Sequence, residues 1–144
     1  PNAIRKYLSK VSGPLLDRMD IHIEVSPVSF DNLSSKAKLE PSCKIRERVN
    51  KAREIQKERL KSVGLLSNSQ IPSHILSTVC ELTEDAKSIL QMAFDKMGLS
   101  ARGYDKILKI SRTIADLAGS EIIDKSHICE AIQYRSLDRK YWGY

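Results

Sequence analysis

The sequence predicts a mainly α-helical chain, and three observations carry that prediction. From residue 71 onward, apolar side chains recur at the three- and four-residue spacing of amphipathic helices. Residues that favour helix starts, such as Thr83 and Asp124, and glycines that favour helix ends, such as Gly98, punctuate this pattern. Alternation typical of a strand is confined to one short stretch, Ile21–Val25.

The first thirty residues combine helix, turn and strand signals. Helical spacing predicts a short helix over residues 2–11, which Gly13-Pro14 should end, and a further helical turn over residues 15–19. Apolar and polar residues then alternate over Ile21–Val25, which predicts a strand with one buried face. Because an isolated strand is not stable in water, we expect its partner strands upstream and interpret the chain as a piece of a longer protein.

A strongly basic helix is expected after a connector over residues 26–40. Pro41 and Ser42 favour its start, and Gly64 favours its end. Residues 41–61 hold eight lysines and arginines against three glutamates, a net charge of +5. The apolar residues of this helix form a narrow stripe, namely Ile45, Val49, Ala52, Ile55 and Leu60.

Four further helices are expected to form a compact bundle over residues 71–137. A short helix over residues 72–80 comes first, opened by its proline. Helices capped by Thr83 and Ser100 follow, closed by glycines at 98 and 119, and the last helix is capped by Asp124. Short connections between amphipathic helices favour a helical bundle.

Composition narrows the class of protein. The chain has 144 residues, a formal net charge of +6 and no apolar run of membrane-spanning length. Its three cysteines are scattered, without a CxxC pair, so we expect buried thiols in a cytoplasmic protein. His22, His74 and His127 have no cysteine or carboxylate at metal-ligand spacing, and we expect surface or strand histidines and no metal site.

Arg18 is the first candidate functional residue. It lies between Asp17 and Asp20, just before the predicted strand, where a guanidinium could be aimed at a phosphate outside the domain. The alternative is a local ion pair with Asp17 or Asp20, which the residues alone favour.

Arg102 is the second candidate. It falls in the first turn of the helix capped by Ser100, where the positive end of the helix dipole repels a cation. A bound anion such as phosphate would resolve this conflict, and a solvated arginine is the alternative.

The basic helix is the third candidate, as a surface for the DNA backbone. A one-sided charge suits phosphates, and the residues concerned are Lys44, Arg48, Lys51, Arg53 and Lys57. The helix has no aromatic residue, so base stacking is not predicted there. A solvated charged face is the more common explanation of such a run.

Three stretches give the chain a specific resemblance to a known family. They are YLSKVSGPLLDRMD (residues 7–20), GLSARGYDKIL (residues 98–108) and AIQYRSLDR (residues 131–139). In this order they resemble the C-terminal part of magnesium-chelatase-like AAA+ ATPases, and in particular the competence-type relatives thought to drive DNA branch migration. The chain itself contains no GxxxxGK[ST] phosphate loop, so we expect this fragment alone to bind no cofactor and to hydrolyse no ATP.

The resemblance implies a division of the chain and roles for two arginines. Residues 1–30 would be the last helix and strand of the αβα nucleotide-binding core, residues 31–70 a connector with the basic helix, and residues 71–144 the helical lid. Arg18 would be an arginine finger that reaches a neighbouring subunit's ATP, and Arg102 the sensor-2 arginine of the lid, in cis or in trans.

The resemblance also implies an assembly and a partner for the full-length protein. It would be a cytoplasmic ATPase, a hexamer that binds ATP and Mg²⁺ and remodels DNA. Two alternatives remain open at this point: a magnesium-chelatase subunit that couples ATP hydrolysis to metal insertion into a porphyrin, and a non-enzymatic helical interaction module.

Overall fold

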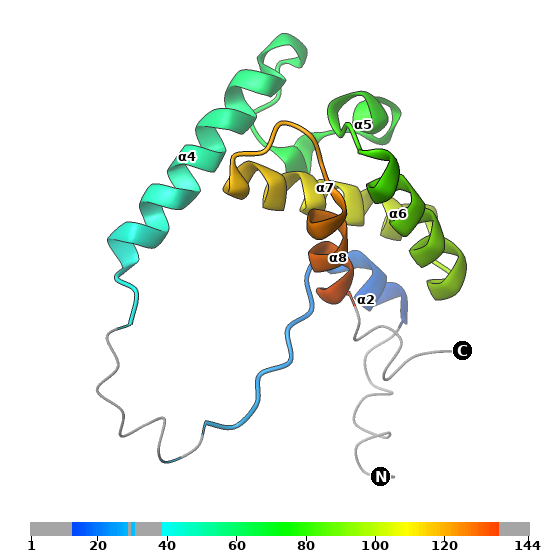
Figure 1. The fold of residues 1–144 in the computed structure, drawn as a ribbon, viewed down its shortest axis with the longest axis horizontal. Coiled ribbons are helices and arrows are strands. Elements are labelled where there is room, and N and C mark those ends of the chain that lie inside the picture. Colours follow the sequence, from blue (N-terminus) through cyan, green and yellow to red (C-terminus); the bar gives the residue numbers. More distant parts are fainter. Residues whose placement is uncertain (1–12, 29, 31–38, 136–144) are drawn as a thin grey trace.

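The computed structural model describes residues 13–28, 30 and 39–135, and this part of the chain is mainly helical (Figure 1). Its α-helices are α2 (Gly13–Arg18), α4 (Ser42–Leu60), α5 (Ser73–Val79), α6 (Glu84–Met97), α7 (Ala101–Ala118) and α8 (Lys125–Gln133). Two 3-10 helices, η1 (Lys61–Val63) and η2 (Asn68–Gln70), connect α4 to α5. The predicted mainly α fold is confirmed, and the helix predicted over residues 2–11 lies outside the described residues.

Helix α7 is the centre of the bundle (Figure 1). It packs against α8, α4 and α5, and α6 packs against α8. Burial of apolar side chains is the main force that holds such helices together, because isolated helices of this length are marginal in water. The buried apolar core comes from all five of these helices and the segments between them: Leu60, Ile71, Leu76, Cys80, Ala86, Leu90, Ile107, Leu108, Ile110, Ala115, Ile123, Ile128 and Ala131.

The predicted helix ends of the bundle are confirmed. The side chains of Thr83, Ser100 and Asp124 each accept a hydrogen bond from a backbone N–H in the first turn of α6, α7 and α8. Gly98 and Gly119 end α6 and α7 with φ of 57° and 73°, a conformation that a residue with a Cβ rarely adopts. Local chemistry therefore sets where these helices begin and end.

The basic helix α4 is only half covered. It begins after Pro41, as predicted, and Ala52, Gln56 and Leu60 in its C-terminal half are buried. Ile45 and Val49 belong to the same predicted apolar stripe, yet they are 43% and 45% exposed. The stripe is therefore buried only toward its C-terminal end, because the N-terminal half of α4 extends beyond the rest of the bundle (Figure 1).

A buried ionic cluster fixes the C-terminal half of α4 to α7, and we call its four residues, Arg59, Asn68, Arg112 and Asp116, the inner cluster. Arg59 donates two hydrogen bonds to the Asp116 carboxylate, at 2.6 and 2.7 Å. Arg112 Nε donates to the same carboxylate at 3.1 Å, and Asn68 Nδ2 donates at 2.8 Å. Arg112 also donates to two backbone carbonyls in the loop after α7.

Burial governs the electrostatics of the inner cluster. The side chains of Arg112 and Asp116 are fully shielded from solvent. Burial lowers the pKa of the Arg112 guanidinium, and the adjacent Asp116 carboxylate opposes that shift. Both oxygens of the Asp116 carboxylate accept hydrogen bonds, and these bonds offset the cost of burying its charge. Removing either Asp116 or Arg112 would leave the charge of the other buried without this compensation.

The N-terminal segment confirms one prediction and departs from another. Helix α2 confirms the helical turn predicted over residues 15–19 but begins earlier, at Gly13-Pro14, which suits a proline because the first turn of a helix needs no N–H donor. Residues 21–28 form no strand, and the side chains of Ile21, Ile23 and Val25 are exposed. The His22 backbone N–H donates to the Tyr134 carbonyl at 2.8 Å, but no neighbouring strand is present among the described residues to form a ladder.

Cysteines and histidines also differ from expectation in their burial. Cys80 is buried, as predicted, but Cys43 and Cys129 are exposed thiols. Burial raises the pKa of the Cys80 thiol to about 11. His22 and His127 are buried, and the His127 ring accepts a hydrogen bond from the Asp124 N–H as part of the capping box of α8.

Candidate functional site

The Asp17–Asp20 segment at the end of α2 is joined to the bundle by four side chains. Three come from the start of α7, and the fourth follows α8. We call this segment and its partners, Ser100, Arg102, Lys106 and Arg135, the junction. Its position explains the arrangement in Figure 1, where α2 lies beside the end of α8.

Asp17 is the hub of the junction. Ser100 Oγ donates to its two carboxylate oxygens at 3.1 and 3.3 Å. Arg102 Nη1 lies 3.7 Å from Asp17 Oδ2, and Arg135 Nη2 lies 3.6 Å from Asp17 Oδ1. One carboxylate therefore joins the end of α2 to α7 and to the residue after α8.

Two cations fix the backbone around Arg18. Arg135 Nη1 donates to the Met19 carbonyl at 2.9 Å, although its side chain is only 1% exposed. Lys106 Nζ donates to the Arg18 carbonyl and lies 2.8 Å from Asp20 Oδ1. Because the carbonyls of Arg18 and Met19 both accept hydrogen bonds from the bundle, the bundle positions the backbone from which the Arg18 side chain extends.

The junction links the two candidate arginines through Asp17 and leaves both accessible to solvent. Arg18 is exposed, and the Arg102 side chain is 57% exposed. Asp17, the partner of Arg102, is the residue directly before Arg18. Sequence reasoning treated the two arginines separately, whereas the structure attaches them to a single set of contacts.

The anion expected at the start of α7 is a carboxylate of this chain. Ser100 Oγ accepts a hydrogen bond from the Gly103 N–H at 3.0 Å and donates to Asp17, so the helix cap itself holds the acid. A negative charge at this end of an 18-residue helix is favourable, because the helix dipole is positive there. Asp17 thus relieves the conflict created by Arg102 in the first helical turn.

The predicted basic surface on α4 divides into paired and unpaired cations. Arg48 donates to Glu40 at 2.5 and 3.2 Å, and this contact lowers the pKa of the Glu40 carboxyl. Lys44 Nζ lies 3.4 Å from Glu47. Among the residues that the structure describes, Lys51, Arg53 and Lys57 form no ion pair or hydrogen bond through their side chains.

Helical spacing places the other cations of α4 on two different sides of the helix. Arg46, Arg53 and Lys57 recur at intervals of seven and four residues, so they share one side of α4. Lys51 lies instead on the side of Glu47 and Glu54, four residues before it and three after it. The sequence prediction included Lys51 and omitted Arg46, and helical phase was the signal that could have corrected it.

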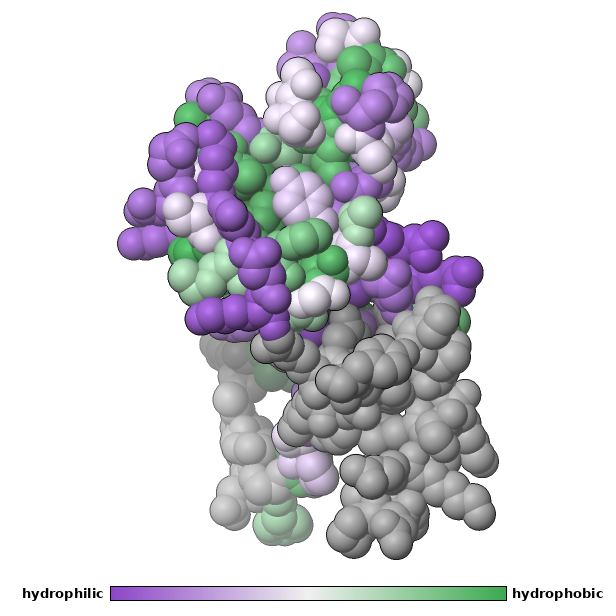
Figure 2. All heavy atoms as spheres, turned by 90° about the vertical axis from the view of Figure 1, so that its right-hand side faces the viewer, coloured by the Kyte–Doolittle hydropathy of each residue, from purple (hydrophilic) through white to green (hydrophobic). Residues whose placement is uncertain are grey.

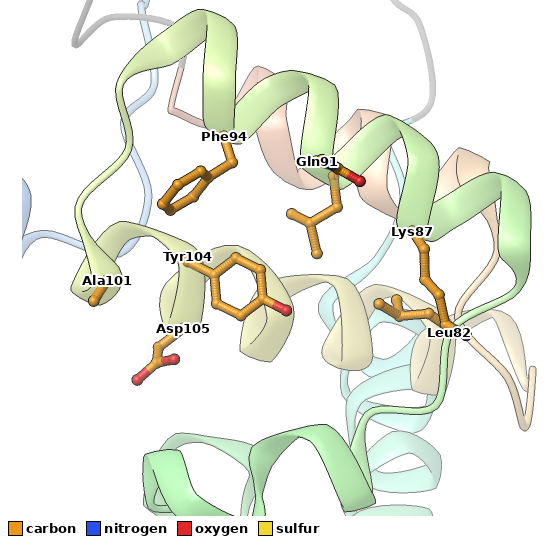
Figure 3. A pocket seen from close by; sticks show the side chains of 8 residues that line it. Leu82, Lys87, Gln91, Phe94, Ala101, Tyr104 and Asp105 are labelled. Atoms are coloured by element: carbon orange, nitrogen blue, oxygen red, sulfur yellow. The ribbon is translucent and has the colours of Figure 1, made fainter.

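A mostly apolar hollow lies on another face of the bundle. It has a volume of about 490 Å³ and lies between α6 and α7. Phe94 and Tyr104 meet there edge to face, with ring centroids 6.1 Å apart, and Lys87 and Asp105 supply charges (Figure 3). Figure 2 shows hydrophobic side chains gathered at the centre of the face on the α6 side. None of the predicted site residues lines this hollow.

Two classes of feature are absent from the described part of the chain. In residues 13–28, 30 and 39–135, no three or more His, Cys, Asp or Glu side chains are grouped as metal ligands. Within the same ranges, no helix combines the length and the apolar character that a membrane crossing requires.

Family models match nearly the whole chain. The model described as magnesium chelatase, subunit ChlI C-terminal, matches residues 39–135. The model described as magnesium chelatase, subunit ChlI, matches residues 1–33. The chain therefore belongs to the magnesium chelatase subunit ChlI family, with its C-terminal domain over α4 to α8.

Similar proteins occur in several bacteria. The competence protein ComM of Haemophilus influenzae is 41% identical over 140 residues, and the uncharacterized protein YifB of Escherichia coli is 35% identical over 141 residues; each alignment covers 96% of this chain. The uncharacterized protein Rv2897c of Mycobacterium tuberculosis is 32% identical over 131 residues, or 91% of this chain. The chain spans 27% of the first two relatives and 26% of the third.

Described residues from all three stretches that carried the family resemblance meet at the junction. Asp17 and Arg18 come from the first, Ser100, Arg102 and Lys106 from the second, and Arg135 from the third. Sequence reasoning identified the stretches and the two arginines but missed Asp17, Lys106 and Arg135 as their supports. These three residues lie in the same stretches of sequence as the motifs, and that was the signal that could have indicated their role.

Proposed function

We propose that this chain is the C-terminal part of a magnesium-chelatase-like AAA+ ATPase in which Arg18 and Arg102 contact the phosphates of ATP. The observation that supports the proposal is the junction, in which both exposed arginines belong to one set of contacts. Exposed guanidiniums suit a polyanion, because each can form paired hydrogen bonds to phosphate oxygens.

Arg18 is the residue proposed to act in the transition state. Phosphoryl transfer spreads negative charge over the oxygens of the transferring group, and an arginine finger stabilises that charge. The Lys106 and Arg135 contacts to the adjacent carbonyls would limit the backbone motion of Arg18. A finger held in this way costs less reorganisation when the reaction occurs.

Both arginines are proposed to act on the same nucleotide. An arginine finger reaches ATP bound by a neighbouring subunit, and Arg102 is paired with the residue directly before Arg18. We therefore propose that Arg102 also acts in trans, which requires an oligomer, and that the oligomer is a hexamer. ATP and Mg²⁺ would be bound mainly by the upstream part of the protein, where Mg²⁺ would neutralise phosphate charge.

DNA is the proposed macromolecular partner, and the proposed activity is DNA remodelling in the cytoplasm. The side of α4 that carries Arg46, Arg53 and Lys57 supports this partner. These cations are exposed and form no ion pair with the described residues, so they can replace counterions on a DNA backbone. The alternative function is metal insertion into a porphyrin, which the family name also allows.

The proposed role of Arg18 is tested in the full-length protein with Arg18→Ala. ATP binding should remain nearly intact, whereas kcat for hydrolysis should fall by about a thousandfold or more, as for other arginine fingers. Mixing this variant with subunits that cannot bind ATP themselves should restore part of the turnover, because each subunit supplies what the other lacks. Unchanged hydrolysis, or the absence of any recovery on mixing, would contradict the role.

A further inference from the structure

The junction contains a bound anion of its own, the Asp17 carboxylate. It occupies the N-terminal end of α7, accepts hydrogen bonds from Ser100 and lies 3.7 Å from an Arg102 nitrogen. These are the groups that a phosphate would use at the same place: a helix start, a hydroxyl and a guanidinium. Asp17 therefore resembles an internal substitute for the phosphate that Arg102 is proposed to contact.

We propose that Asp17 is a positioning residue that holds Arg102 when no nucleotide is present and yields Arg102 to phosphate when nucleotide binds. This inference rests on the proposed function, because it concerns the same arginine and the same ligand. Asp17 thereby lowers the affinity for nucleotide while it keeps Arg102 close to the surface from which Arg18 extends.

Asp17 forms one ion pair with an exposed arginine, Arg102, and one with a buried arginine, Arg135. The exposed pair is the weaker of the two, so it is the one that can be exchanged for phosphate. The contact with Arg102 involves a side chain that is 57% exposed, so the pair is weak and easily replaced. A phosphate carries more negative charge than a carboxylate and can accept two hydrogen bonds from one guanidinium. Phosphate therefore competes favourably for Arg102.

The second ion pair keeps Asp17 in place during the exchange. Arg135 is only 1% exposed, lies 3.6 Å from Asp17 and is tied to the Met19 carbonyl. Moving a carboxylate away from a buried cation is costly, because solvent screens their attraction only weakly there. Asp17 thus stays with Arg135 and Ser100, and Arg102 is the partner that changes.

Asp17→Asn in the full-length protein tests the inference. The amide keeps the shape and can still accept the Ser100 hydrogen bond, but it no longer competes by charge for Arg102. We expect equilibrium binding of a fluorescent ADP analogue to tighten by on the order of two- to fivefold, the range that one exposed ion pair supports, and KM for ATP to fall with it. A merely structural role would leave binding unchanged or weaken it, and either of those results would overturn the inference.

The control variants assign the effect to Arg102. Glu84→Gln changes an exposed acid on α6 that pairs with Lys87, outside the junction, and it should leave the affinity unchanged. In a double-mutant cycle, Asp17→Asn should have no effect on affinity once Arg102→Ala is present, because Asp17 acts through that arginine. Tightening that persists without Arg102 would overturn the inference.

Two further measurements keep the test decisive. If Asp17→Asn does not fold, Asp17→Asn with Arg135→Gln removes both members of the buried ion pair, and the same tightening is expected. Arg102→Ala alone separates the two proposals: if it leaves nucleotide binding unchanged, the proposed function of Arg102 is wrong. If it weakens binding and neither Asp17 variant tightens it, only the role of Asp17 is wrong.

Discussion

Helix α7 carries two groups of charged residues, and they differ in their access to solvent. The inner cluster, in the C-terminal half of the helix, buries Arg112 and Asp116 completely and ties α4 to α7. The junction, at the start of the helix, ties α2 to α7 but leaves Arg18 and Arg102 exposed. Similar chemistry is thus found at the two ends of one helix, and of these two groups the junction is the one whose guanidiniums are accessible to a ligand.

The comparison suggests how to separate structural from functional arginines in this chain. A guanidinium with buried carboxylate and carbonyl acceptors, like Arg112, has its donors committed to the fold. A half-exposed guanidinium such as Arg102, which lies 3.7 Å from its carboxylate partner, can turn toward a different acceptor. Arg135 is of the first kind, since it is buried and donates to the Met19 carbonyl, yet it supports the residues around Arg18.

The largest expected effect on stability comes from breaking the inner cluster. Asp116→Ala leaves Arg112 buried and Arg59 half-buried without their shared carboxylate, and we expect a loss of about 3–5 kcal/mol in the free energy of unfolding. Urea denaturation of the chain, followed by circular dichroism, measures it. The matched control is Asp20→Ala at the exposed side of the junction, expected to cost about 1 kcal/mol or less. Equal losses for the two variants would remove the distinction between the groups.

The next prediction concerns the side of α4 that the inner cluster holds in place. Changing Arg46, Arg53 and Lys57 to Glu in the full-length protein should weaken DNA binding for all sequences and reduce its logarithmic salt slope by roughly three. Lys44→Glu with Lys51→Glu is the control, because those cations lie beside glutamates on α4. Equal effects of the two sets, or no change in slope for the first, would contradict a role for this side of the helix.

A smaller effect is expected from the cap that supports the junction. Ser100→Ala removes the N-cap of α7 and the hydrogen bonds to Asp17, whereas Thr83→Ala removes only the N-cap of α6. Each should cost about 1 kcal/mol of stability, as loss of a cap usually does. Only Ser100→Ala should also change nucleotide affinity in the full-length protein. A matching change in affinity for Thr83→Ala would show that the effect is not specific to the junction.

The smallest prediction uses Cys80, which lies near the inner cluster. Its pKa is raised to about 11, so the folded chain keeps the proton at pH values where an unfolded thiol, near 9, releases it. The contribution of this group to stability is therefore present below pH 9 and is lost as pH rises toward 11. Cys80→Ala should remove part of the loss of stability between these values, and an identical pH profile for both proteins would contradict this origin.

The local features of the bundle could be predicted because neighbouring residues determine them. The caps at Thr83, Ser100 and Asp124 and the glycine after α6 each act within one helical turn. The uncovered half of α4 could not be predicted, because helical spacing reveals an apolar stripe but not how far its partner extends. The strand predicted over Ile21–Val25 was wrong because alternation of residues does not show whether partner strands are present, and the described residues supply none.

The sequence was enough to identify the two arginines of the candidate site, but not the contacts that join them. Arg18 and Arg102 were identified from their motifs and from the unfavourable position of a cation at a helix start. That Asp17 is the anion at that position depends on a contact across 83 residues of sequence. No pattern within the chain specifies which distant acid approaches a given helix end, so this pairing required the fold.

Arg18 and Arg102 are proposed to act together, in trans, on one nucleotide. The most direct test is to mix full-length Arg18→Ala subunits with Arg102→Ala subunits and to measure ATP hydrolysis. If both arginines come from the same neighbour, every site in a mixed ring lacks one of them, and no turnover beyond that of the separate variants is expected. A double variant mixed with subunits that cannot bind ATP should recover turnover and prove that exchange occurs. Recovery in the first mixture would contradict joint action in trans, because it would mean that Arg102 acts in its own subunit while Arg18 acts in the next.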